Sequence, residues 1–196
     1  MKLDFKQLNN LPNILSMLRL YCVPVFLVLF FVFSPNYMPA FIVFVVASLT
    51  DVLDGFIARK FDLITQTGKV LDPLADKLLV ISTILAFAVV GIVHWWFFGV
   101  MFLIYLIMII TGLVLFEKQV VIPSNILGKV GTFVMTGGLF LCFFPNWFAP
   151  WNEYVLYIGL GIVISSVIVY ISFNYKEVLK QLGKPKNRDK NGDNEA

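Results

Sequence analysis

The sequence predicts an all-α, polytopic membrane protein with six transmembrane helices and a short N-terminal helix lying at the membrane interface. Of the 196 residues, 59% are hydrophobic and 14% are charged, whereas soluble domains contain about 25% charged residues. The mean hydropathy is +0.87. The apolar residues form runs that are each near the ~20 residues needed to cross ~30 Å of hydrocarbon. One compact bundle is therefore expected rather than several domains.

The order of polar and apolar segments gives the expected elements. Residues 1–12 are polar with leucine and phenylalanine on one helical face, which predicts the interfacial helix. Turns containing proline, asparagine or tryptophan and two polar connections separate the spans that follow. Residues 1–175 would form a single transmembrane domain, and residues 176–196 a polar, basic tail. The expected spans are about 14–33, 40–59, 67–93, 97–116, 126–144 and 154–173.

The distribution of positive charge predicts the orientation of the chain. The turns after the first, third and fifth spans contain no lysine or arginine, although the sequence holds 15 such residues. By the positive-inside rule, both termini and the connection between the second and third spans face the cytoplasm, in an inner or cytoplasmic membrane. The basic tail is expected to associate with anionic lipids. Nucleic-acid binding is not expected, because acidic residues such as Glu177 and Asp189 interrupt the tail.

Four aspartates at the junction of the second and third spans are the main chemical feature of the sequence. Asp51 and Asp54 share one helical face near the end of the second span, and Asp72 and Asp76 share one near the start of the third. A charge at mid-membrane costs roughly 2.5–3.5 kcal/mol on insertion scales. These carboxylates are therefore expected at the membrane interface, in a wet cavity, or bound to cations.

The residue types in this stretch favour hard metal ions and a phosphate ligand. Oxygen ligands without histidine or cysteine select Mg²⁺, Mn²⁺ or Ca²⁺ rather than zinc. Four aspartates suffice to bridge two ions roughly 3.5–4 Å apart, an arrangement that clamps transferring phosphates. Arg59 adds a positive charge suited to phosphate oxygens. Two simpler interpretations stay open: Arg59, Lys69 and Lys77 could neutralise the aspartates, and small residues on the same faces could serve close helix packing.

The spacing of these residues resembles a known signature. Asp51-x-x-Asp54-Gly55-x-x-Ala58-Arg59, eight further residues and Gly68-x-x-x-Asp72-x-x-x-Asp76 are similar to the full motif of the CDP-alcohol phosphatidyltransferases. The segments LPNILSMLR, DPLADK and IPSNILGK look like those of the bacterial phosphatidylglycerophosphate synthases in that family. The likeness covers about residues 8–135.

The resemblance implies a six-helix, homodimeric membrane enzyme with two divalent cations, Mg²⁺ or Mn²⁺. It would transfer a phosphatidyl group from CDP-diacylglycerol to an alcohol and release CMP. Asp76 would be the catalytic base and a metal ligand. The other metal ligands implied are Asp51, Asp54 and Asp72. The residues implied around the CDP moiety are Asp51, Gly55, Ala58, Arg59 and Gly68.

The acceptor alcohol is the least defined part of the prediction. Glycerol 3-phosphate is favoured, but the region Leu103–Gly112 lacks the arginine and acidic residue that such synthases carry in the fourth helix. The candidates to bind an acceptor phosphate are then Lys129, Arg19 and Lys118. Alternatives are phosphatidylglycerol, giving cardiolipin, or another alcohol or polyol phosphate. Outside this class, a cation carrier using intramembrane aspartates and a membrane scaffold without activity are the competing interpretations.

Overall fold

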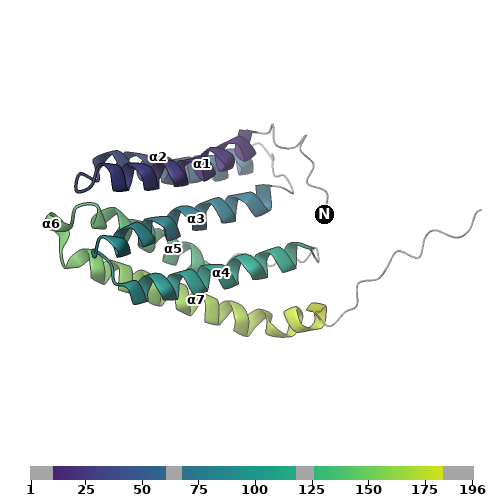
Figure 1. The fold of residues 1–196 in the computed structure, drawn as a ribbon. Coiled ribbons are helices and arrows are strands. Elements are labelled where there is room, and N and C mark those ends of the chain that lie inside the picture. The colour runs from purple at the N-terminus through teal and green to yellow at the C-terminus, as the bar shows by residue number, and fades with distance from the viewer. Residues whose placement is uncertain (1–10, 61–67, 118–125, 183–196) are drawn as a thin grey trace, which may run out of the picture.

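Six long helices and one short helix make up the described part of the chain (Figure 1). The computed structural model describes residues 11–60, 68–117 and 126–182 and, within them, the side chains of residues 16–50, 74–111, 126–169 and 172. Strands are absent from these ranges, so the all-α prediction is confirmed for them. The helices are α1 (Leu11–Val32), α2 (Met38–Lys60), α3 (Gly68–Val89), α4 (Trp95–Glu117), α5 (Ile126–Cys142), α6 (Pro145–Phe148) and α7 (Trp151–Leu182).

The long helices lie alongside one another and run back and forth between two ends of a bundle (Figure 1). At one end, α1 is linked to α2 and α3 to α4, and the short α6 lies there too; we refer to it as the turn end. At the other end, α2 finishes at Lys60 and α3 begins at Gly68; we refer to it as the signature end. The short connections at the turn end make sequential helices antiparallel neighbours.

The described helices differ in how well they meet the length and composition expected of a membrane span. Trp151–Val169 is the one stretch within the described ranges that is both long and apolar enough by itself to cross a bilayer. Shorter apolar helices of 10–17 residues are found at Ser16–Val32, Met38–Thr50, Trp95–Thr111 and Ile126–Cys142.

The end of α3 differs from the sequence expectation, and the backbone explains the difference. We expected this helix to continue to Val93, but it ends at Val89. Gly91 has a φ of 80°. The amide of Ile92 donates to the carbonyl of Phe87 (2.9 Å), and that of Gly91 to the carbonyl of Ala88 (3.2 Å). These bonds form a Schellman motif, in which glycine adopts the left-handed conformation that stops the helix.

The first and last helices also have bounds that differ from the expected ones. Helix α1 starts at Leu11, three residues before the predicted span, with Pro12 in its first turn, where proline is tolerated. Helix α7 starts at Trp151 and continues to Leu182, so the predicted tail begins within a helix. The predicted interfacial helix at residues 1–12 lies outside the described residues apart from its last two positions.

Three helix pairs form the main contacts of the bundle. Helix α1 packs on both α2 and α3, and α5 packs closely on α7. The α5–α7 contact depends on glycines. A Cβ added at Gly159 would lie 3.2 Å from the backbone nitrogen of Met135, and one added at Gly138 would lie 2.8 Å from Leu156 Cδ2. Small residues at such positions allow two helix backbones to approach.

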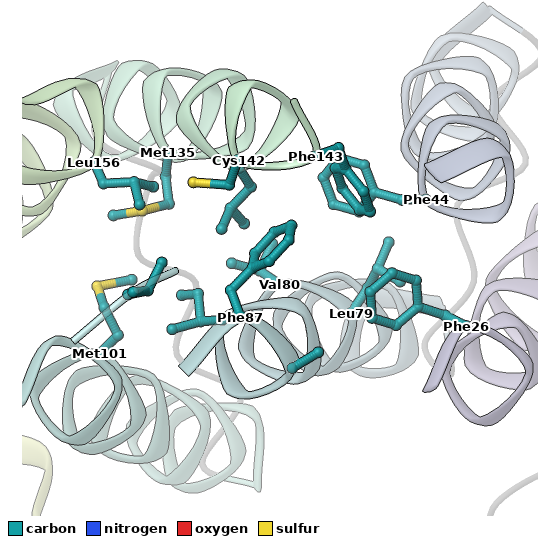
Figure 2. Close-up of a cluster of buried hydrophobic side chains, with 14 of the residues drawn as sticks. Phe26, Phe44, Leu79, Val80, Phe87, Met101, Met135, Cys142, Phe143 and Leu156 are labelled. Atoms are coloured by element: carbon teal, nitrogen blue, oxygen red, sulfur yellow. The ribbon is translucent and has the colours of Figure 1, made fainter. Parts of the chain in front are cut away.

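Aromatic side chains join the group formed by α1, α2 and α3 to the α5–α7 pair near the turn end. Figure 2 shows labelled side chains from α1, α2, α3, α4, α5 and α7 meeting in one buried cluster. Within it, the ring centroid of Phe143, the residue directly after α5, lies 4.9 Å from that of Phe87 on α3 and 5.4 Å from that of Phe44 on α2. Such tilted and edge-to-face pairs each contribute about 0.5–1.5 kcal/mol beyond area burial. They fix the distance between α2 and α5 at this end.

Candidate active site

A cavity of about 620 Å³ lies between α2, α3 and α5, with one residue of α1 at its wall. Its position follows from the packing. Phe41 and Phe140 hold α2 and α5 together near the turn end, with ring centroids 5.0 Å apart. The lining residues are Arg19, Phe44, Val45, Ala47, Ser48, Leu49, Asp76, Leu79, Val80, Lys129, Thr132, Phe133, Thr136, Gly137 and Phe140.

Three residues predicted from separate parts of the sequence line this one cavity. Asp76 comes from α3, Lys129 from the first turn of α5 and Arg19 from α1. Their spatial proximity could not be read from spacing along the chain, because more than a hundred residues separate Arg19 from Lys129. The cavity therefore combines one carboxylate with two groups that carry positive charge.

The two cations differ in their surroundings. Arg19 is 1% exposed, although arginine is almost never fully buried unless its charge is paired. Its Nε donates a hydrogen bond to the carbonyl oxygen of Ala47 on α2, at 3.4 Å. Arg19 thus ties α1 to α2 while lining the cavity. Lys129 is exposed, so its ammonium group can reorient toward a ligand at lower cost.

The wall contributed by α5 follows one helical face. The lining residues of α5 include four that are spaced by three or four positions, as one face of an α-helix requires. These residues are Lys129, Thr132, Thr136 and Phe140. Thr132 Oγ1 donates to the carbonyl of Gly128 (3.0 Å), and Thr136 Oγ1 donates to the carbonyl of Thr132 (2.9 Å). Both hydroxyl protons are therefore used within α5, and their oxygen lone pairs are the groups left for a ligand. The sequence analysis missed both threonines; their helical spacing from Lys129 was the available signal.

The remaining predicted site residues fall where the structure describes backbone alone or nothing. The last turns of α2 contain Asp51, Asp54, Gly55, Ala58 and Arg59, and the first turns of α3 contain Gly68 and Asp72. The side chains of these residues lie outside the described part of the structure. Helices α2 and α3 contact each other. Lys118 lies outside the described ranges altogether. Among the described side chains, no three histidine, cysteine, aspartate or glutamate residues gather as metal ligands do.

The sequence match to known proteins covers the helices that line this cavity. Residues 9–171 match the family model described as CDP-alcohol phosphatidyltransferase. The chain belongs to the CDP-alcohol phosphatidyltransferase family. The match includes the whole of α1, α2, α3 and α5 and the part of α7 up to residue 171. The resemblance stated from the signature is thereby confirmed.

Individual members of the CDP-alcohol phosphatidyltransferase family are similar over different parts of the chain. A CDP-diacylglycerol–glycerol-3-phosphate 3-phosphatidyltransferase of Rickettsia bellii is 49% identical over 81 residues, which are 41% of this chain and 42% of that relative. The protein of the same name from Aquifex aeolicus is 28% identical over 88% of this chain and 99% of its own length. A probable phosphatidylglycerophosphate synthase of Mycobacterium tuberculosis (strain ATCC 25618 / H37Rv) is 34% identical over 71% of this chain and 68% of its own.

Proposed function

We propose that the protein transfers a phosphatidyl group from CDP-diacylglycerol to glycerol 3-phosphate, giving phosphatidylglycerophosphate and CMP. Family membership supports the reaction class, and the names of the relatives support the two substrates. The observation that carries the proposal is that Asp76, Arg19 and Lys129 line one cavity beside the helices that contain the signature. A base and two cations in one cavity match an acceptor that has both a hydroxyl and a phosphate.

In this proposal the acceptor is held by its charge and activated by a carboxylate. Lys129 and Arg19 would bind the phosphate of glycerol 3-phosphate through charge-assisted hydrogen bonds, which are about twice as strong as neutral ones. Asp76 would take the proton of the acceptor hydroxyl as its oxygen bonds to the β-phosphorus of CDP-diacylglycerol. The bond between that phosphorus and the oxygen bridging to CMP breaks, so CMP leaves with the electron pair. A general base of this kind contributes typically 10²–10⁴-fold.

Two divalent cations, Mg²⁺ or Mn²⁺, would complete the site. The donor set fits them, because Asp51, Asp54, Asp72 and Asp76 supply oxygen ligands without histidine or cysteine. When bound, such ions would neutralise the pyrophosphate and stabilise the leaving CMP. Gly55, Ala58, Arg59 and Gly68 would then surround the CDP moiety, the small residues leaving room and the arginine binding phosphate oxygens.

The proposed setting is a membrane, with the signature end on the cytoplasmic side. The six long helices would be the spans, and the exposed hydrophobic side chains on their outer faces, among them Val28, Ile42 and Ile107, would contact lipid. The charged segments at the signature end support this orientation through the positive-inside rule. A homodimer is part of the same proposal and rests on the family resemblance.

The proposal is tested by measuring CMP release from CDP-diacylglycerol by the purified protein with glycerol 3-phosphate and Mg²⁺. Removal of divalent cations should abolish release, and Mg²⁺ or Mn²⁺ should restore it. Asp76→Asn should lower turnover by about 10²-fold or more, because the base is lost. Glu153→Gln is the matched control: Glu153 accepts a hydrogen bond from Tyr157 near the turn end (3.3 Å), far from the cavity. Turnover near the wild-type rate in Asp76→Asn would refute the assigned role.

A further inference from the structure

The cavity has two parts of different chemistry, and the proposed reaction uses one of them. Its charged groups belong to Arg19, Asp76 and Lys129 near the signature end, and its uncharged polar groups to Ser48, Thr132 and Thr136. Further along α5, toward the turn end, most of the lining is apolar. These lining residues are Phe44, Val45, Leu79, Val80, Phe133 and Phe140. A cavity of 620 Å³ is larger than a small acceptor and a carboxylate need.

The cavity has an exposed, apolar rim. Leu49 on α2 is 58% exposed, and Phe133 and Phe140 on α5 are 81% and 41% exposed. In a bilayer these side chains would contact lipid, so the rim would allow an apolar chain to enter from the membrane. At the far end the Phe41–Phe140 ring contact closes the space between α2 and α5. The opening is therefore lateral, between two helices that would stand in lipid, and it leads to the charged end.

Gly137 lies in the wall of this apolar part and has no packing role there. A Cβ added at Gly137 would meet nothing within 4 Å. Its neighbour Gly138 is different, since a Cβ there would collide with Leu156 on α7. Glycine inside a helix is about 1 kcal/mol less favourable than alanine, and close helix packing does not account for it at this position. Gly137 is exposed and lines the cavity, so a side chain added there would extend into its open side.

We propose that Gly137 is a specificity-determining residue, which keeps the apolar part of the cavity open for one acyl chain of the phosphatidyl donor. The inference rests on the proposed function, because the occupant is the lipid whose phosphate reacts beside Asp76. Gly137 lies roughly two turns beyond Lys129 along α5, about 12 Å at 1.5 Å per residue. A long acyl chain extending from the charged end therefore passes Gly137, whereas a short one is expected to end before it.

The experiment compares CMP release from dioctanoyl and dioleoyl CDP-diacylglycerol in mixed micelles, for the wild type and Gly137→Leu. The leucine side chain would occupy the path of the long chain. We expect the ratio of kcat/KM for dioleoyl over dioctanoyl substrate to fall about tenfold, the size of an overpacking effect. Gly137→Ala should shift the ratio less but in the same direction, and it decides the question if the leucine variant does not insert. Phe140→Ala, which removes the ring at the closed end, should not lower the ratio.

Gly161→Leu on α7 is the matched control, because a Cβ at Gly161 also meets nothing within 4 Å but the residue does not line the cavity. Its ratio should equal that of the wild type. If Gly137→Ala and Gly137→Leu both keep the wild-type ratio, the cavity holds only unselected bilayer lipid and the inference is overturned. If the wild type releases no CMP from either substrate, the proposed function itself fails, which is a distinguishable result.

Discussion

Arg19 and Lys129 line the same cavity but differ in burial. This difference determines whether a substitution at each position reports on ligand binding alone or also on protein stability. Arg19 is 1% exposed and connects α1 to the Ala47 carbonyl of α2. Lys129 is exposed on the first turn of α5. Replacing the buried arginine would disturb helix packing as well as any ligand, so its phenotype would be mixed. Lys129 is the residue whose replacement reports on ligand binding.

We predict that Lys129→Gln raises the KM for glycerol 3-phosphate by about tenfold or more, because a hydrogen bond to a charged group contributes roughly 1.5–3 kcal/mol. The KM for CDP-diacylglycerol and the thermal unfolding midpoint should change little, since the lysine side chain is exposed. Initial rates at varied concentrations of each substrate provide the measurement. Lys129→Arg, which retains the charge, is the control and should keep most of the affinity. An unchanged acceptor KM in Lys129→Gln would remove Lys129 from the acceptor site.

At the scale of helices, the contact between α5 and α7 determines where the α5 wall of the cavity stands. Gly131 and Gly138 on α5 and Gly159 on α7 lie at this contact. The nearest neighbour of a Cβ at Gly159 would be backbone, the nitrogen of Met135 at 3.2 Å and its Cα at 3.3 Å. Backbone cannot move aside as a flexible side chain can. The two helices would therefore have to separate to accept a larger residue.

Gly159→Val is accordingly expected to destabilise the protein by about 1–3 kcal/mol, the usual effect of overpacking. The thermal unfolding midpoint in detergent measures this effect. Gly161→Val is the internal control, because the same side chain is added two residues away where a Cβ meets nothing within 4 Å. Equal midpoints for the two variants would contradict the close α5–α7 contact.

The helices themselves were largely predictable from the sequence, whereas their ends were less so. Long apolar runs bounded by proline and asparagine predicted all six long helices in order. The end of α3 was placed four residues too late, because hydropathy continues through Ile92 and Val93 while the backbone turns at Gly91. The glycine was the available signal. The short α6 was expected to be a turn, since four residues give no periodicity.

At the scale of the whole molecule, the two ends of the bundle have different roles. Near the turn end, the rings of Phe26, Phe41, Phe44 and Phe87 surround Phe143 and hold α1, α2, α3 and α5 together. Toward the signature end, the same helices border the cavity that contains Asp76 and Lys129. A rigid aromatic end and an open charged end allow a ligand to enter without loss of the core.

The candidate site was only partly predictable, for a physical reason. Asp76, Arg19 and Lys129 could each be named from the sequence, because charge within an apolar run is conspicuous. The cavity that they share could not be predicted from the sequence, since it depends on how α1 and α5 pack around α3. Gly137 and Gly138 look equivalent in the sequence, yet one lines the cavity and the other packs on Leu156. Such a difference arises only from helix rotation in the folded bundle.

The central claim is that this cavity joins a phosphatidyl group to a phosphorylated alcohol, and identification of the lipid product tests it most directly. Purified protein would receive labelled CDP-diacylglycerol with Mg²⁺ and equal concentrations of glycerol 3-phosphate, phosphatidylglycerol and a phosphate-free alcohol such as inositol. We predict that the label appears in phosphatidylglycerophosphate with equimolar CMP. Label in cardiolipin or phosphatidylinositol instead, or no labelled lipid product at all, would contradict the account.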